Sequence, residues 1–283
     1  MDSLQASNLS CGILLQNTHH TTITGSVIKN NQNSGLLMFK SHVINVTNTT
    51  SSGNMQRGME YFSCTNTNMM NVSIINNKKD GITLYTSNNT NMSEISAIKN
   101  GINGLLLIDC HNNNMVNILS AFNMGSGLNL ESCDNITMRN ISSSNHYDGA
   151  DLDNCRNVYM ETISVRKNMM GILLFGNIIM SLINISATDN KQDGMNIESC
   201  KDIIMTNITA TNNQNGGIRK QSCINTTLTH VNVTNNQKDG ILIVQSSIVT
   251  IKNIASLNYN GDIGISFSQC TSSIQLEDCK FSM

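Results

Sequence analysis

Glycine recurs along this chain at a nearly constant interval, and that interval limits the folds that the chain can adopt. Successive members of the series are 22, 23 or 24 residues apart: Gly12, Gly35, Gly58, Gly81, Gly104, Gly127, Gly149, Gly171, Gly194, Gly217, Gly240 and Gly264. A period of this length indicates a solenoid, in which each coil buries its apolar face only when the next coil stacks on it. The repeat predicts one domain of about twelve coils over residues 1–283.

Apolar residues alternate directly after each glycine. The first and third residues after it are apolar in almost every coil, as in Leu105 and Leu107 or Met195 and Ile197. Such alternation is typical of a strand with one buried face. Apolar positions that recur eleven and fourteen residues after the glycine predict two more inward-facing segments. The expected fold is an all-β, single-stranded parallel β-helix with three short strands per coil.

Asparagine repeats with the same period and predicts a ladder of stacked amides. It lies four residues before eleven of the twelve glycines, while Asn168 is displaced by one position: Asn8, Asn31, Asn54, Asn77, Asn100, Asn123, Asn145, Asn190, Asn213, Asn236 and Asn260. Stacked amides can bond to the backbone and to the amide of the next coil, at about 1 kcal/mol for each bond. We expect this ladder to fix the register between coils.

Cysteine occupies the sixth position after the glycine in seven coils: Cys64, Cys110, Cys133, Cys155, Cys200, Cys223 and Cys270. Serine, threonine or asparagine takes this position elsewhere, so the position favours a small buried residue. In-register stacking would hold neighbouring Cβ atoms about 4.8 Å apart, which exceeds the usual disulfide distance. We expect stacked free thiols rather than disulfides or a zinc site.

The segments GLNLESCDNITMRNIS, residues 127–142, and GMNIESCKDIIMTNIT, residues 194–209, show all of these repeats together. They resemble the parallel β-helix repeats of the right-handed, pectate-lyase-like superfamily, and the resemblance extends over essentially the whole chain. It implies a right-handed solenoid. It does not imply one activity, because that fold serves polysaccharide lyases, glycoside hydrolases, epimerases, phage tailspikes and adhesins.

Composition excludes two classes of partner. With a formal net charge of −2, the chain lacks the basic excess that nucleic acid or an anionic membrane selects. Its most apolar stretch, residues 171–185, is interrupted by Asn177 and is shorter than the roughly 18 residues that a membrane-spanning helix requires. We expect neither nucleic-acid binding nor membrane insertion.

The two ends of the chain read like interior coils. The first residues, MDSLQASNLSCG, lack the cationic start and apolar core of a signal peptide, and neither end shows a capping helix. We interpret the chain as a segment of a longer protein, whose other segments or a second protomer would be partners. Twelve Asn-x-Ser/Thr triplets, including those at Asn140 and Asn184, suit a glycoprotein and favour an extracellular or cell-surface location, while a cytoplasmic one stays open.

The outward residues of the first strand break the repeat, and in this fold they face the usual substrate groove. An apolar and aromatic stripe of early coils, which includes Leu37 and Ile108, gives way to polar and acidic residues in later coils. The candidate substrate-binding residues on this face are Phe39, Phe62, Tyr85, Asn129, Glu198 and Arg219.

Three carboxylates on the same face are the candidate catalytic residues: Glu131, Asp151 and Asp153. Asp151 and Asp153 should project about 6.6 Å apart, with Glu131 about 4.8 Å from Asp153 on the adjacent coil. Carboxylates at such separations serve as acid and base in glycoside cleavage, and crowded ones also recruit Ca²⁺. The alternative is an exposed strand face solvated by acidic residues. Asp148 belongs to the repeat, because Asp also precedes the glycine at Asp80, Asp193 and Asp239.

Three functions agree with these observations. The first is a rigid scaffold of a surface or secreted protein that binds carbohydrate along the outer face of the first strand, without a cofactor. The second is a polysaccharide-active enzyme, a hydrolase, lyase or epimerase, that uses the acidic patch. The third is an intracellular repeat domain that binds proteins through its apolar stripe.

Overall fold

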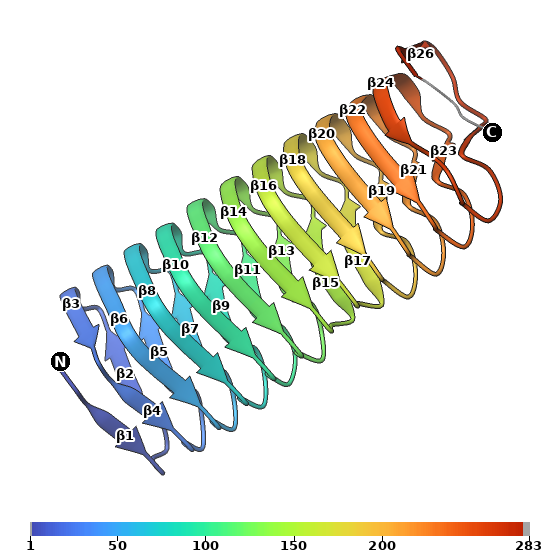
Figure 1. The fold of residues 1–283 in the computed structure, drawn as a ribbon. Coiled ribbons are helices and arrows are strands. Elements are labelled where there is room, and N and C mark those ends of the chain that lie inside the picture. The colour runs from blue at the N-terminus through green and yellow to red at the C-terminus, as the bar shows by residue number, and fades with distance from the viewer. Residues whose placement is uncertain (1, 280–283) are drawn as a thin grey trace. The chain divides into compact units, whose positions relative to one another are not determined.

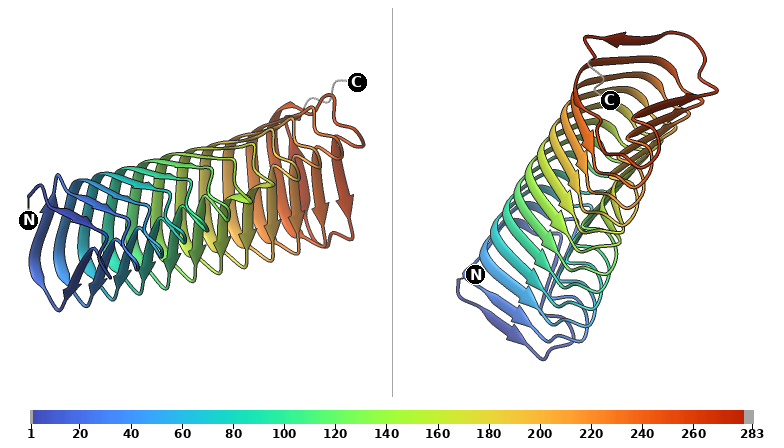
Figure 2. Two further views of the ribbon diagram at one scale, coloured as in Figure 1. Left: turned by 90° about the horizontal axis from the view of Figure 1, so that it is seen from below. Right: turned by 45° about the vertical axis from the view of Figure 1, so that its right-hand side comes forward.

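The computed structural model describes residues 2–279, and all regular elements among them are β-strands. The chain divides into two compact units, one ending at Tyr147 and the other beginning at Asp148, and each is described by itself. Within each unit, short strands form one parallel sheet and long strands form another, coil upon coil (Figures 1 and 2). Within residues 2–279, no helix is long and apolar enough to cross a membrane.

The first unit contains strands β1 to β14. Its short strands pair in parallel and in register: β2 (Ile13–Gln16), β5 (Leu36–Phe39), β7 (Met59–Phe62), β9 (Ile82–Tyr85), β11 (Leu105–Ile108) and β13 (Leu128–Glu131). Its other strands form the second sheet: β1 (Gln5–Ser7), β3 (His19–Thr24), β4 (Val27–Lys29), β6 (His42–Ser52), β8 (Thr65–Ile75), β10 (Asn88–Ile98), β12 (His111–Ala121) and β14 (Asp134–Ser144).

The second unit repeats this arrangement. Its short strands are β15 (Asp148–Asp153), β17 (Met170–Phe175), β19 (Met195–Glu198), β21 (Ile218–Gln221), β23 (Ile241–Val244) and β25 (Ile265–Ser268). The sheet of long strands contains β16 (Arg156–Arg166), β18 (Ile178–Thr188), β20 (Lys201–Thr211), β22 (Ile224–Thr234), β24 (Ser247–Ser256) and the shorter β26 (Ile274–Glu277). The predicted parallel solenoid of about twelve coils is confirmed, with six of the short strands of residues 2–279 in each unit.

The three predicted inward-facing segments occur, but two of them lie in one continuous strand. In β12 the inward residues Asn113 and Met115 are followed by Ile118, so the alternation of buried and exposed residues shifts by one position. The shift falls at Asn117, whose φ is +56°. A left-handed residue turns the backbone without breaking the ladder to the neighbouring strands, so each long strand supplies two sides of the core.

Left-handed residues also explain why the chain is so rich in asparagine. The coil that begins at Gly104 has four of them, at Asp109, Asn112, Asn117 and Phe122, with φ between +52° and +57°. Asparagine accepts this conformation more readily than other side chains with a Cβ atom, because its amide bonds locally. Several Asn-x-Ser/Thr triplets have their asparagine at such a position, among them those at Asn140, Asn184 and Asn207.

The repeated glycine is required by close packing rather than by its φ angle. A Cβ atom built on Gly104 would lie 2.2 Å from Oγ of Ser120 and 2.6 Å from the carbonyl oxygen of Gly127 on the next coil. On Gly194 it would lie 2.7 Å from the amide nitrogen of Asn213. Any side chain at these positions would push neighbouring coils apart, so the glycine period marks where the coils approach most closely.

The asparagine ladder is confirmed, except at the predicted rungs Asn8 and Asn145. Asn8 is an exposed left-handed residue, and Leu9 takes the rung position, where its backbone N–H donates to Oδ1 of Asn31 at 3.0 Å. In the first unit Nδ2 of Asn77 donates to Oδ1 of Asn100 at 3.0 Å, and Nδ2 of Asn100 donates to Oδ1 of Asn123 at 3.0 Å. Asn145, predicted as a rung, instead is a left-handed residue, and His146 takes the inward position. This coil has 22 residues instead of the usual 23, and the missing residue lies between the rung and the glycine. The rung therefore lies three residues before the glycine instead of four. For the same reason the displaced Asn168 is a rung of the second unit, and its Nδ2 donates to Asn190.

His146 makes the first unit sensitive to pH. Nδ1 of His146 lies 3.1 Å from the backbone nitrogen of Asn123 and 3.2 Å from its carbonyl oxygen, so it accepts from the N–H or donates to the carbonyl according to its tautomer. Burial lowers the pKa of His146, so the unfolded chain binds more protons and stability falls as the pH drops below about 6.5. We expect His146→Asn to restore a ladder rung, to add about 1 kcal/mol of stability at pH 6, and to flatten the loss below it. Urea unfolding at pH 5, 6 and 8 measures this, and an unchanged pH profile would contradict the assignment.

All nine cysteines lie within residues 2–279 and are free thiols. Cys64, Cys110, Cys133, Cys155, Cys200 and Cys223 are buried at the small inward position, as expected from their spacing. Each sulfur lies against backbone carbonyls. Sγ of Cys110, for example, is 3.2 Å from the carbonyl oxygen of Ile108 and 3.4 Å from that of Leu84. The thiols therefore close the corner between the short strand and the long strand.

Candidate functional site

Three predicted ligand-binding aromatics form a stack on the outer face of the short-strand sheet in the first unit. The rings of Phe39 and Phe62 are 5.0 Å apart and within 6° of parallel, and those of Phe62 and Tyr85 are 4.9 Å apart and within 10°. Strands β5, β7 and β9 pair in register, which places these residues on successive rungs. The three rings, here called the aromatic stack, cover one another's faces, so their edges form most of the surface open to a ligand.

Beside the aromatic stack lies a set of paired charges, here called the Arg57 network. The guanidinium of Arg57 forms ion pairs with the carboxylates of Glu60 and Asp80, the latter at 3.0 Å, and donates to the hydroxyl of Tyr85 at 3.1 Å. Oγ of Ser34 donates to Glu60 at 2.9 Å. Burial alone would lower the pKa of Arg57, but the two carboxylates outweigh it and raise that pKa. Arg57 therefore holds two carboxylates beside the aromatic rings.

A second row of residues on the short strands, two positions before the row of the aromatic stack, is covered. The alternation predicts that Glu60, Thr83 and Leu106 project outward, yet they are only 6%, 0% and 9% exposed. The guanidinium of Arg57 reaches across from the turn before β7, and its central carbon lies 5.7 Å from the centre of the Tyr85 ring. The surface available to a ligand is therefore the row of fourth residues after the glycine, not the full outer face.

The Arg57 network was not predicted from the sequence. Its signal was the residue type directly before the repeated glycine, where Arg57 is the one basic residue of the series. Asp80 has the scaffold role expected from its repetition, because its Oδ1 accepts from the backbone N–H of Asn103 at 3.1 Å. Oδ1 of Asp193 accepts from Gly216 in the same way. These aspartates bond each coil to the next.

The predicted acidic patch is divided between the two units. Glu131 is an exposed residue of β13 in the first unit, whereas Asp151 and Asp153 are half-buried residues of β15 in the second. The proximity of Glu131 to Asp153 stays a prediction. Within β15, burial and the charge of Asp151 raise the pKa of Asp148 to about 6. Oδ1 of Asp153 is buried without a hydrogen-bond partner.

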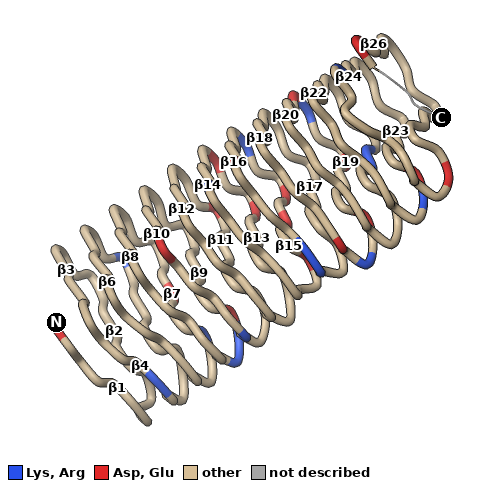
Figure 3. The backbone as a smooth tube through the Cα atoms, in the orientation of Figure 1, with Lys and Arg blue, Asp and Glu red and all other residues tan. Residues whose placement is uncertain are grey.

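The other predicted binding residues are not members of the aromatic stack. Asn129 and Glu198 are half-buried on β13 and β19, and Arg219 is exposed on β21. Arg219 lines a small cavity of about 120 Å³ together with Asp193 and Lys238. Charged residues of both signs occur along the tube of each unit, and most of the tube is uncharged (Figure 3). Within residues 2–279, no three His, Cys, Asp or Glu side chains are arranged to hold a metal ion, and the predicted Ca²⁺ site stays untested.

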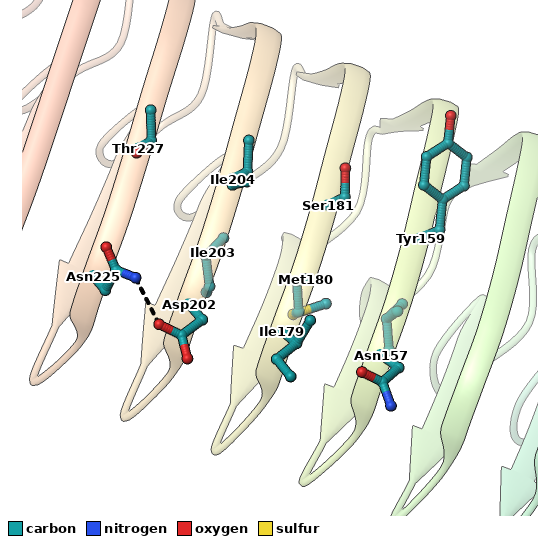
Figure 4. Close-up of a pocket in the computed structure, with 11 residues that line it drawn as sticks. Asn157, Tyr159, Ile179, Met180, Ser181, Asp202, Ile203, Ile204, Asn225 and Thr227 are labelled. Carbon is teal, nitrogen blue, oxygen red and sulfur yellow. Dashed lines mark hydrogen bonds between the residues drawn. The ribbon is translucent and has the colours of Figure 1, made fainter.

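A larger groove of about 490 Å³ crosses the outer face of the long strands in the second unit, over β16, β18, β20 and β22 (Figure 4). One row of its lining consists of Asn157, Ile179, Asp202 and Asn225, and Nδ2 of Asn225 donates to Asp202 at 2.6 Å. The exposed Ile204 belongs to a second row. This surface was not predicted from the sequence, because the predicted site lay on the outer face of the short strand.

Ile179 is strained in this groove. Its φ is +60° and its side chain is 43% exposed, while the equivalent residues Asn157 and Asp202 suit a left-handed backbone. The left-handed conformation costs about 1–2 kcal/mol in a β-branched residue. We expect Ile179→Asn to stabilise the protein by about 1 kcal/mol, measured by urea unfolding. Ile204→Asn is the matched control, because it removes an exposed isoleucine without relieving a left-handed φ. Equal effects of the two substitutions would contradict the assignment of strain.

The comparisons agree with this fold. The family model described as a right handed beta helix region matches residues 5–120 and 116–255, so the chain belongs to the right-handed β-helix family. A comparison with curated protein sequences finds no match.

Solved structures share the fold at low identity. A periplasmic alginate epimerase aligns at 13% identity with a TM-score of 0.57, over 93% of this chain and 76% of its own. The A-module of a mannuronan C-5 epimerase from Azotobacter vinelandii aligns at 11% identity with a TM-score of 0.56, over 93% and 90%. A surface protein and adhesin of Streptococcus pneumoniae aligns at 11% with a TM-score of 0.53, over 98% and 91%. At these identities the likeness establishes the architecture and no activity.

Proposed function

We propose that this protein is a rigid β-helix scaffold that binds a carbohydrate chain along the short-strand face of its first unit. The observation that carries the proposal is the aromatic stack beside the Arg57 network. Ligand sites are mostly apolar, with a few fixed polar groups that set orientation, and this surface has both. Parallel rungs hold the side chains in place before a ligand arrives, which reduces the entropy lost on binding.

The expected ligand is extended, because the apolar row of fourth residues after the glycine continues over successive rungs from Phe39 on β5 to Ile108 on β11. Its sugar rings would contact the aromatic edges, while their hydroxyl groups would bond to the phenol of Tyr85. A surface or secreted location follows from this role. In support, the structures that share the fold include a periplasmic enzyme and a bacterial surface adhesin.

Phe62→Ala tests this assignment, because Phe62 is the central ring of the aromatic stack. We expect at least a tenfold weaker affinity for the bound glycan, or about 1.4 kcal/mol, measured on an array and by calorimetry. Phe122→Ala is the matched control, since Phe122 belongs to the same unit, is 56% exposed and lies outside the apolar row. Circular dichroism verifies folding of both variants. Equal loss in both, or no loss in Phe62→Ala, would contradict the proposed site.

The second candidate function is a polysaccharide-active enzyme. The raised pKa of Asp148, about 6, favours it, because a carboxyl group of this kind can hold a proton for a leaving group near neutral pH. Asp151 and Asp153 would then be the partner carboxylates on the same strand. Turnover that is abolished by Asp151→Asn would support this candidate over the scaffold.

A further inference from the structure

Four asparagines of this chain are followed directly by glycine: Asn100, Asn103, Asn215 and Asn260. In such a pair the backbone nitrogen of the glycine can attack the side-chain amide carbon of the asparagine, because glycine has no Cβ atom to hinder the approach. The attack needs a base for the N–H proton, and the amide nitrogen that leaves needs a proton. The four pairs differ in what surrounds these two nitrogens.

Asn215 and Gly216, in the turn before β21, both bond to one carboxylate. The backbone N–H of Gly216 donates to Oδ1 of Asp193 at 2.7 Å, and Nδ2 of Asn215 donates to the same oxygen at 2.7 Å. Asp193 belongs to the preceding coil and is 4% exposed, and burial raises its pKa, which makes its carboxylate a stronger base. One oxygen can therefore take a proton from the attacking nitrogen and return it to the leaving nitrogen.

The small cavity of about 120 Å³ in the second unit lies at this turn, because Asp193, Asn215 and Gly216 all line it. Arg219 and Lys238 line it too, and both side chains are exposed. Their positive charges would stabilise the negative charge that develops on the amide oxygen of Asn215 during the attack. The cavity has room for water, and Asn215 and Gly216 are only half-buried, so water reaches the product.

The other three pairs bond differently. Each of their glycines donates its backbone N–H to a peptide carbonyl: Gly101 to Asn77 at 2.8 Å, Gly104 to Ser126 at 2.9 Å and Gly261 to Asn236 at 2.8 Å. A peptide carbonyl accepts a hydrogen bond but does not take up a proton at neutral pH. These pairs therefore serve as internal references for the pair at Asn215.

We propose that Asn215 is a site of self-modification, at which Asp193 promotes loss of the side-chain amide. Asp193 takes the N–H proton of Gly216, the backbone nitrogen bonds to Cγ of Asn215, and a cyclic imide forms as the C–Nδ2 bond breaks. Nδ2 takes the proton from Asp193 and leaves as ammonia. A water then adds to either carbonyl of the imide and opens the ring, which gives aspartate or isoaspartate. In total the protein consumes one water and releases one ammonia, with no oxidation or reduction.

The modification would loosen the contact between two coils. The product carries a new carboxylate beside Asp193, so two like charges replace the hydrogen bond from Nδ2 of Asn215. An isoaspartate also adds a methylene group to the backbone and displaces the N–H of Gly216 from Oδ1 of Asp193.

The test is peptide mapping of the full chain after incubation at about pH 7.5 and about 37 °C. We expect Asn215 to lose its amide at least about tenfold faster than Asn100 and Asn103, and Asp193→Asn to slow this loss by at least about tenfold. The variant should fold, because Asn103 occupies the equivalent position before its glycine and its Oδ1 accepts from the backbone N–H of Ser126 at 2.8 Å.

Asp239→Asn is the matched control for Asp193→Asn. Asp239 lines the same cavity, but its Oδ1 accepts from the backbone N–H of Ile263 at 3.0 Å and not from an Asn-Gly pair. We expect the rate at Asn215 in this variant to stay within about twofold of the wild type, since the base at the attacking nitrogen is unchanged.

The dependence on pH separates a carboxylate base from simple attack driven by hydroxide. Between about pH 7 and 8.5 the wild-type rate at Asn215 should be nearly constant, because a carboxylate base is already ionised there. In Asp193→Asn the rate should rise about tenfold per pH unit, in proportion to hydroxide.

Three results would overturn the proposal. A rate at Asn215 that is equal or higher in Asp193→Asn would show that Asp193 only holds the turn. A wild-type rate at Asn215 no faster than at Asn100 would show that the turn does not promote the reaction. A wild-type rate that rises in proportion to hydroxide would exclude Asp193 as the base. None of these outcomes depends on whether the protein binds a glycan.

Discussion

Replacement of Arg57 by methionine should cost about 3–5 kcal/mol of stability, one of the two largest effects that we expect from a single substitution. The side chains of Glu60 and Asp80 are 8% and 2% exposed, and Arg57 is the cation that pairs with both. Removal of one partner from a buried ion pair leaves uncompensated charge in a site that water does not reach. Urea unfolding of the wild type and Arg57→Met measures the loss.

Two further variants separate charge from packing. Arg57→Met combined with Glu60→Gln and Asp80→Asn should recover most of the lost stability, because no buried charge is then unpaired. Arg156→Met, at an exposed position, should change stability by no more than about 0.5 kcal/mol. If the triple variant were as unstable as Arg57→Met alone, the Arg57 network would act through packing rather than through charge.

Replacement of Lys220 by methionine should stabilise the protein by about 1–4 kcal/mol, which is the opposite of what a core substitution usually does. Lys220 is 1% exposed in the core of the second unit, and its Nζ has no hydrogen-bond partner. Methionine fills a similar space between Ile197 and Ile243 and needs no hydrogen-bond partner. Urea unfolding under reducing conditions measures the gain. Lys238→Met is the control, because Lys238 is exposed.

The pH dependence gives an independent check on Lys220. Burial lowers its pKa in the folded state, whereas the unfolded chain keeps a value near 10.4. Between these two pKa values the unfolded chain binds more protons than the folded chain. The buried ammonium therefore destabilises the folded state most at low pH, and this destabilisation decreases as the pH rises. The advantage of Lys220→Met should therefore be larger at about pH 6 than at about pH 9.5. An advantage that grew with pH would contradict a buried ammonium.

The architecture could be predicted from the sequence because each of its causes repeats. The glycine repeats because neighbouring coils approach closely there, as at Gly104. The asparagine repeats because its amides stack in a ladder, as from Asn77 to Asn123. The exchange of Asn145 for His146 could not be predicted, because a one-residue deletion does not reveal on which side of the rung it falls. The sequence also did not predict that two of the three segments of each coil join into one long strand. Periodicity alone does not show that the backbone ladder continues through a left-handed residue such as Asn117.

The candidate site was predictable only in part. In-register stacking brings Phe39, Phe62 and Tyr85 together, and their equal spacing in the sequence was enough to predict that. Alternation does not reveal that a long side chain from a preceding turn covers the strand, so the burial of Glu60 beneath Arg57 was missed. Roles for Asn129, Glu131, Asp151, Asp153, Glu198 and Arg219 stay predictions.

A glycan array screened with the purified wild-type protein, with and without Ca²⁺, tests the central claim most directly when each bound glycan is also examined for chain shortening or new unsaturated ends. A scaffold that binds through the aromatic stack predicts binding to an extended glycan, with no change in the glycan itself. Absence of binding, or cleavage that Asp151→Asn removes, would contradict that account.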